Sequence, residues 1–306
     1  MTEEFFDVAL QTTSGSFDPR NQDWAHFPPP QGDFSLGADF WIGGLPYNTD
    51  SDVVFDACEP AGFNHRPYRQ YRDRYAFCRK ANPPSHGPEF YEWDNEGFLG
   101  RTLFLSRLIH PTTVAPHYSA RLIFQDGELT NVVPANRGYG SHVWIVANEW
   151  RDWLCETEAH ELRTGMAIYN VQPPERVRRA RSHIDHAFHA YYLDQRTASL
   201  VSSFESLLKV ERHNMTAQFK LRVPTLAQMA GLAVSPDEAE VLYDDRSVFV
   251  HGLAPKYTDV GDEVMERYNR FETVLRRSLL LASTDTRFCE LFATDQEVVR
   301  AFGNLS

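Results

Sequence analysis

The adjacent prolines Pro173 and Pro174 mark the point where the character of this chain changes. A proline pair breaks a helix, because each ring removes a backbone N–H and clashes with the preceding turn. Before the pair, short apolar runs alternate with Gly- and Pro-rich segments, which is typical of strands and loops. After it, apolar residues recur every three or four positions, as on one face of a helix. We therefore predict an α+β protein of two domains, residues 1–170 and 171–306.

The first domain is predicted to be an α+β module in which antiparallel strands dominate. Its clearest signal is a hairpin over residues 118–133, where Asp126 and Gly127 separate two strand-like runs. The other elements predicted here are strands over residues 5–12 and 39–43, loop over 44–66, a helix or a strand over 98–109, and an amphipathic helix over 149–169.

Basic and aromatic residues alternate between Arg69 and Lys80. Such a strip occurs in nucleic-acid grooves, where rings stack on bases and cations hold phosphates. A strand with aromatic side chains on one face and charged ones on the other gives the same period of two, and we favour this interpretation. The domain has no nucleophile, metal-ligand or phosphate-loop motif, which argues against a small-molecule enzyme. We expect a sensor or regulator that takes a protein or a ligand.

The second domain is predicted to be an up-and-down bundle of four or five helices. Two capping boxes, Ser235–Glu238 and Thr294–Glu297, predict helix starts, and Pro236 occupies a favourable first position. The longer predicted helices cover residues 175–212 (one long helix, or two joined nearly end to end), 216–230, 236–251 and 263–283.

The net charge of −12 argues against a protein that binds nucleic acid tightly by general phosphate neutralisation. Residues 1–170 carry 13 Lys and Arg against 23 Asp and Glu, whereas residues 171–306 carry 17 against 19. A local basic surface on the second domain could still handle a short RNA. The most basic segment, a candidate RNA-binding surface with a solvated helix face as the alternative, contains Arg176, Arg178, Arg179 and Arg181.

Three histidines, His183, His186 and His189, recur every third residue in the same segment. A metal site on one helix face is conceivable, but no second ligand cluster accompanies them, so a polar helix face is favoured. The four cysteines form no CxxC pair, which predicts free thiols in a reducing compartment. No signal peptide or membrane-spanning segment is visible. We expect a cytoplasmic protein that uses no metal and no other cofactor.

The segment Tyr243–Gly252 combines groups that suit phosphodiester chemistry. Arg246 can hold a phosphate, and His251 can transfer a proton near neutral pH. The Arg-x4-His spacing alone is not informative, because Arg178–His183 and Arg181–His186 repeat it. The third instance differs in context, since it ends a helix with a capping box at its start and a glycine directly after the histidine.

The pattern Tyr-x2-Arg-Ser-x3-His-Gly in this segment resembles the signature of ApeA-like HEPN domains. Residues 198–226 resemble the two earlier helices of that domain, and the whole resemblance covers about residues 175–285. It implies an all-α HEPN-type helical bundle that pairs as a homodimer. It also implies a metal-independent endoribonuclease that acts on RNA in phage defence or as a toxin.

By this resemblance, Arg246 would neutralise the scissile phosphate and His251 would act as general base or acid. The 2′-hydroxyl of RNA would attack the neighbouring phosphorus and leave a 2′,3′-cyclic phosphate and a 5′-hydroxyl. Tyr243 and Ser247 complete the candidate catalytic set. Ser247 stands where many active HEPN nucleases have Asn, His or Asp, and where ApeA-like members usually have Ser. The alternative is a non-catalytic HEPN module that binds a nucleotide or a protein partner.

Overall fold

The computed structural model describes residues 2–13, 34–37, 39–58, 76–81, 98–112, 114–136, 154–190, 192–208, 214–250 and 261–303. These residues form two compact units. The first reaches Met166, and the second begins at Ala167 and also includes Arg107–Ile109. Within the described ranges, no helix combines the length and the apolar character needed to cross a membrane.

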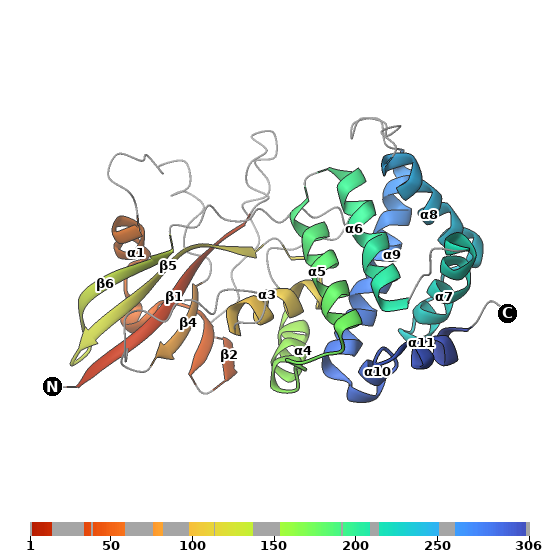
Figure 1. Ribbon diagram of the computed structural model, residues 1–306. Helices are drawn as coiled ribbons and strands as arrows, with labels where there is room; N and C mark the ends of the chain where they lie inside the picture. Colours follow the sequence, from red (N-terminus) through yellow and green to blue (C-terminus); the bar gives the residue numbers. More distant parts are fainter. Residues whose placement is uncertain are drawn as a thin grey trace. The chain divides into compact units, whose positions relative to one another are not determined.

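The first unit is built on one antiparallel sheet, whose described strands follow the order β2-β3-β4-β1-β5-β6 (Figure 1). The central strand β1 pairs with β4 on one side and with β5 on the other. The strands are β1 (Glu3–Thr13), β2 (Phe34–Gly37), β3 (Phe40–Gly43), β4 (Ala76–Ala81), β5 (Val114–Gln125) and β6 (Glu128–Asn136). The expected α+β layout, with antiparallel strands first and helices after them, is confirmed.

The hairpin between β5 and β6 confirms the turn predicted at Asp126 and Gly127. Both residues have a positive φ, 52° and 87° respectively, as a two-residue type I′ turn requires. The register places Gln125 opposite Glu128, directly beside the turn. The backbone N–H of Thr2 donates to Asp126 Oδ1 at 3.0 Å, which joins the turn to the start of β1.

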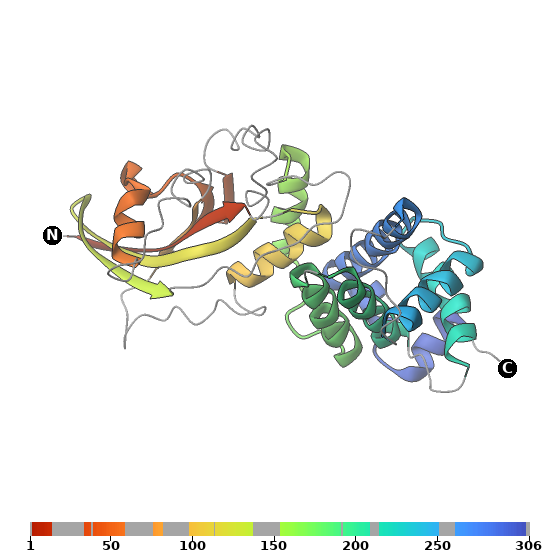
Figure 2. The same cartoon turned by 90° about the horizontal axis from the view of Figure 1, so that it is seen from above.

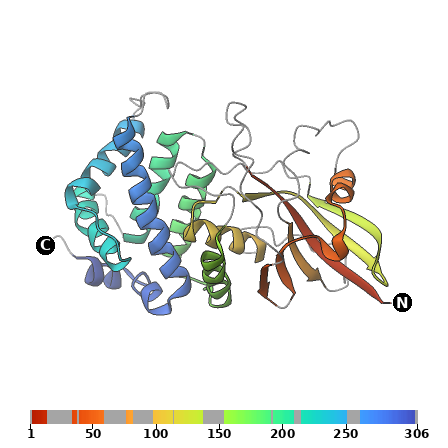
Figure 3. The same ribbon diagram turned by 180° about the vertical axis from the view of Figure 1, so that it is seen from behind.

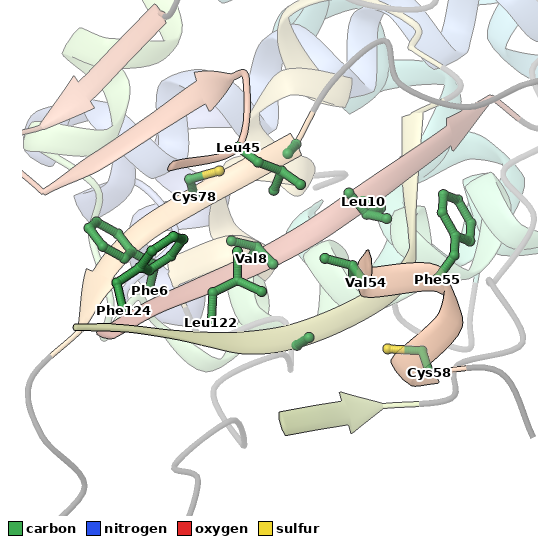
Figure 4. Close-up of a cluster of buried hydrophobic side chains, with 12 residues drawn as sticks. Phe6, Val8, Leu10, Leu45, Val54, Phe55, Cys58, Cys78, Leu122 and Phe124 are labelled. Atoms are coloured by element: carbon green, nitrogen blue, oxygen red, sulfur yellow. The ribbon is translucent and has the colours of Figure 1, made fainter. Parts of the chain in front are cut away.

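The hydrophobic core of the first unit lies between one face of the sheet and helix α1 (Ser51–Cys58). Alternate residues of β1 point to this face, because side chains alternate along a strand. Figure 4 shows Val54 and Phe55 of α1 in the same cluster as the residues from the sheet. The sheet residues of this cluster include Phe6, Val8, Leu10, Leu122 and Phe124.

The prediction of a loop over residues 44–66 is wrong for Ser51–Cys58, which form helix α1. This helix has only eight residues, which is too short for a clear apolar period. Its formation depends on the sheet, against which Val54 and Cys58 are fully buried. Burial of this kind comes from residues distant in the sequence, so local composition does not reveal it.

Two further helices belong mainly to the first unit. Residues 98–109, which fit either element, form helix α3 (Phe98–Ile109). The helix predicted over residues 149–169 is α4 (Glu156–Ala167), so its predicted start is wrong. The backbone N–H of Cys155 donates to Glu158 Oε2 at 2.9 Å, and this bond caps the observed start. Residues 149–153 lie outside the described ranges.

The alternating segment Arg69–Lys80 is described only from Ala76 onward, where it forms β4. Arg79 donates to Asp7 Oδ2 at 2.9 Å. Lys80 donates to Glu4 Oε1 at 2.6 Å. Both cations are therefore paired with carboxylates of β1, and the strand interpretation is confirmed for this part.

The second unit is a bundle of helices in which the long helix α9 packs against α5, α6, α7 and α8 (Figure 3). At its centre, the ring of Phe204 meets those of Phe219 and Phe271 edge to face, with centroids 5.8 and 6.3 Å away. The helices are α5 (Glu175–His189), α6 (Leu193–Leu208), α7 (Met215–Met229), α8 (Pro236–Val250), α9 (Asp262–Thr284), α10 (Thr286–Glu290) and α11 (Asp295–Phe302).

The prediction of one long helix, or of two joined end to end, over residues 175–212 is wrong. The extended backbone of Ala190, with φ −74° and ψ 130°, ends α5, and α6 returns beside it (Figures 1 and 2). Ser203 Oγ donates to the carbonyl of Ala180 at 2.7 Å, which holds the two helices together. Both helices have the same apolar period, so periodicity cannot reveal that the chain reverses.

The capping box predicted at the start of α8 is confirmed. The N–H of Ser235 donates to Glu238 Oε2 at 2.7 Å, and the N–H of Glu238 donates to Ser235 Oγ at 3.2 Å. At the start of α11, the N–H of Glu297 donates to Thr294 Oγ1 at 3.2 Å. Helix α8 is described as far as Val250. Its predicted glycine cap, Gly252, lies beyond the described ranges.

Candidate functional site

Tyr243 fixes helix α8 against two neighbouring helices. Its side chain is 5% exposed. Its hydroxyl donates to Oε1 of Glu205 on α6 at 3.1 Å. Its ring centroid lies 5.1 Å from that of Phe219 on α7. Tyr243 therefore holds the middle of α8 in place, and it sets the position of the residues one turn further on.

Arg246 lies one helical turn after Tyr243, with its Cζ 5.9 Å from the centroid of that ring. The Nε of Arg246 is buried, and none of the described residues accepts a hydrogen bond from it. The carboxylate of the preceding residue, Asp245, pairs with a different arginine, because Arg267 Nε donates to Asp245 Oδ2 at 2.8 Å. Within the described ranges Arg246 thus has no carboxylate partner, which leaves its guanidinium able to hold an anion.

The structure describes less about the other two residues of the predicted catalytic set. Ser247 is half-buried and follows Arg246 on α8. His251 comes directly after Val250, the last described residue of the helix, and it lies outside the described residues. The structure therefore brings Tyr243 and Arg246 together, and it gives no distance from either of them to His251.

Burial raises the pKa of Tyr243 to about 12, and the neighbouring carboxylate of Glu205 adds to the effect. The opposing influence of Arg246 is smaller. At neutral pH the phenol is therefore fully protonated, and it acts as a hydrogen-bond donor to Glu205.

This raised pKa predicts how stability depends on pH. The contribution of the protonated Tyr243 to the free energy of unfolding is fully present below the ordinary tyrosine pKa of 10.0. It is lost as the pH rises toward about 12. The reason is that the unfolded chain releases the phenolic proton first. Between pH 10 and about pH 12, the free energy of unfolding of Tyr243→Phe should therefore decline less than that of wild type. Urea titrations at several pH values in this range measure the difference. Tyr268, whose pKa is also raised by burial, remains in both proteins. Identical pH profiles for the two proteins would contradict the assignment.

A pocket of about 540 Å³ lies on helices α5 and α6, beside the segment that leads into α11. Glu205 belongs both to this pocket and to the contact with Tyr243. The pocket therefore adjoins the motif helix. Its polar lining includes Arg176, Arg179, His183, Ser202, Glu205 and Ser206.

The four arginines predicted to bind RNA do not form one surface. Arg176 and Arg179 line the pocket. Arg178 is 59% exposed and pairs with Glu175. Arg181 is a structural link, because it donates to Ser283 Oγ on α9 at 2.9 Å and lies over the ring of Tyr169. Burial lowers the pKa of Arg181.

The three histidines of α5 differ in their surroundings. His183 lines the pocket, and burial lowers its pKa, with positive charge on His186 adding to the effect. His186 is exposed. His189 Nδ1 donates to the carbonyl of Asp185 at 2.7 Å when it carries the proton. In the described part of the chain, no three His, Cys, Asp or Glu side chains are grouped so that they could hold a metal ion.

Comparison of the chain with protein-family models, curated proteins and solved structures gives no match. The important residue that sequence reasoning missed is Glu205, which precedes Tyr243 by 38 positions. Its position on α6 agrees with an ordinary surface carboxylate, and only the packing of α6 on α8 reveals the contact.

Proposed function

We propose that this protein is a metal-independent endoribonuclease of the HEPN type, which cleaves RNA through attack by the 2′-hydroxyl. The observation that supports the proposal is that Arg246 has no carboxylate partner among the described residues. This guanidinium lies on the helix that carries the Tyr-x2-Arg-Ser-x3-His-Gly pattern, and no described carboxylate neutralises it. A phosphodiester is an anion of the right size and geometry for such a group.

In the proposed reaction, Arg246 binds the non-bridging oxygens of the scissile phosphate and stabilises the charge that develops there. A base removes the proton of the 2′-hydroxyl, and the 2′-oxygen forms a bond to phosphorus. The bond from phosphorus to the 5′-oxygen breaks, and this oxygen takes up a proton. His251 serves as one of the two proton-transfer groups. The products are a 2′,3′-cyclic phosphate and a 5′-hydroxyl.

Tyr243 is a positioning residue in this proposal, because its contact with Glu205 holds the turn that carries Arg246. Ser247 supplies a hydroxyl next to the arginine, where it can donate a hydrogen bond to a phosphate oxygen. The proposed enzyme acts as a homodimer of helical bundles, in phage defence or as a toxin. The strand-rich unit regulates it through a protein or a small ligand.

The test is to incubate the purified full-length protein with a mixed-sequence RNA in EDTA and to analyse the ends of the products. We expect cleavage with 2′,3′-cyclic phosphate and 5′-hydroxyl ends. A substrate with a 2′-deoxynucleotide at the cleaved position should resist cleavage, because the attacking hydroxyl is missing. Cleavage of that substrate, or products with 5′-phosphate ends, would overturn the mechanism. Expression of the protein in growing cells should also arrest growth.

A further inference from the structure

We infer that the pocket on α5 and α6 binds one nucleotide of the RNA strand beside the scissile bond, with its phosphate on Arg179. This inference rests on the proposed nuclease and assigns its substrate subsite. The pocket volume of about 540 Å³ lies within the range of sites that take small organic ligands.

Arg179 is the cation that is able to bind a new anion. Its side chain is 66% exposed. Its Nε donates to Glu175 Oε1 at 2.8 Å, and its two terminal nitrogens have no partner among the described residues. These nitrogens can donate two parallel hydrogen bonds to a phosphate. Arg176 is less available, because it already pairs with Asp295 and reaches the carbonyl of Ser206.

Two of the three carboxylates of the pocket are paired with arginines, which reduces their repulsion of a phosphate on Arg179. Glu175 accepts from Arg178 at 2.8 and 2.7 Å as well as from Arg179. Asp295 accepts from Arg176. Glu205 uses Oε1 to accept from Tyr243. Its Oε2 has no partner in the described ranges, so the pocket offers an acceptor as well as donors.

This mixture of groups fits a nucleotide better than a bare phosphate. A base and a ribose present both donors and acceptors. Glu205 can accept from a base N–H, and the hydroxyls of Ser202 and Ser206 can do either. His183 adds a ring on which a base can stack. Its lowered pKa, caused mainly by burial, favours the neutral ring.

The pocket is connected to Arg246 through two side chains. Glu205 forms part of the pocket wall and accepts from the hydroxyl of Tyr243. The ring of Tyr243 lies directly beside the guanidinium of Arg246. An RNA strand that places one phosphate on Arg246 can thus place a neighbouring nucleotide in the pocket.

The test compares Arg179→Gln with Arg300→Gln in the full-length protein. Arg300 is a matched control, because it is 77% exposed, pairs with a carboxylate on its own helix, and does not line the pocket. Arg179→Gln should leave the helix intact, since Arg178 still pairs with Glu175. We expect KM for RNA to rise about tenfold with kcat unchanged, because glutamine loses the charge and at least one of the two hydrogen bonds to the phosphate. Arg300→Gln should have the KM and the kcat of wild type.

Binding is measured separately with a labelled 2′-O-methyl RNA, which cannot be cleaved. Fluorescence anisotropy should show about tenfold weaker binding for Arg179→Gln, with a smaller salt dependence. If wild type cleaves RNA but the two variants share its KM and its Kd, the pocket assignment fails and the nuclease stands. If RNA binding depends on Arg179 but no cleavage occurs, the nuclease fails and the pocket stands only as an RNA-binding site. Binding of AMP or UMP as tightly as RNA would overturn the assignment to an RNA strand, and so would the absence of RNA binding by wild type.

Discussion

Replacing His251 or Arg246 with alanine is expected to lower kcat for RNA cleavage by about 10²–10⁴-fold, the usual worth of a positioned proton-transfer group or charge-stabilising group. Arg246→Lys should restore little of the activity, because a lysine ammonium keeps the charge but cannot form the planar two-point contact with a phosphate. Initial rates on a defined RNA in EDTA measure these effects.

His186→Ala is the matched control for His251→Ala. Arg181 and His186 have the same spacing as Arg246 and His251, but His186 is exposed and Arg181 binds Ser283. We expect His186→Ala to cleave RNA at the wild-type rate. Thermal unfolding of Arg246→Ala should also stay near wild type, because no described residue accepts a hydrogen bond from its Nε. Unchanged cleavage by both alanine variants would mean that Arg246 and His251 do not carry the reaction. Absence of cleavage by wild type would leave the protein as a non-catalytic module.

Local signals predicted much of the fold. The turn at Asp126 and Gly127 needs a positive φ that few residues adopt, so two positions sufficed to predict the β5–β6 hairpin. The capping box at Ser235 and Glu238 is also complete within four residues. Features of this kind are visible in the sequence, because all the interacting groups lie close together in the chain.

Features that depend on distant contacts could not be predicted in this way. The short helix α1 forms where Val54 and Cys58 are buried by the sheet. The reversal at Ala190 is not encoded in the apolar period on either side of it. At the candidate site, Tyr243 and Arg246 were identified from their motif, whereas the contact of Tyr243 with Glu205 depends on the packing of α6 against α8.

Buried charge is a second feature that the apolar pattern does not reveal. Glu272 on α9 is 3% exposed, and Arg196 on α6 is 1% exposed. Arg196 Nη2 lies 3.8 Å from Glu272 Oε2, and Arg276 Nε lies 3.6 Å from Glu272 Oε1. The Nε of Arg196 also donates to the hydroxyl of Tyr268 at 3.3 Å. This network joins α6 to α9 inside the bundle.

We expect Glu272→Gln to lower the free energy of unfolding of the helical unit by about 3–5 kcal/mol, the usual cost of removing one partner from a buried ion pair. The shape of the side chain is kept, but the buried guanidinium groups of Arg196 and Arg276 lose the charge of this carboxylate. The midpoint of thermal unfolding should fall by roughly 10 °C, given about 2–4 °C per kcal/mol for a domain of this size. Urea unfolding followed by circular dichroism measures the change.

Glu266→Gln is the control for Glu272→Gln, because Glu266 lies on the same helix and is exposed. It removes the same charge without taking a carboxylate away from a buried cation, so the free energy of unfolding should change by less than about 0.5 kcal/mol. Equal effects of the two substitutions would mean that net charge, and not the buried network, sets the result. A marginal effect of Glu272→Gln alone would mean that water or other groups compensate Arg196 and Arg276. The link between α6 and α9 would then rest on apolar packing around Phe204 and Phe271.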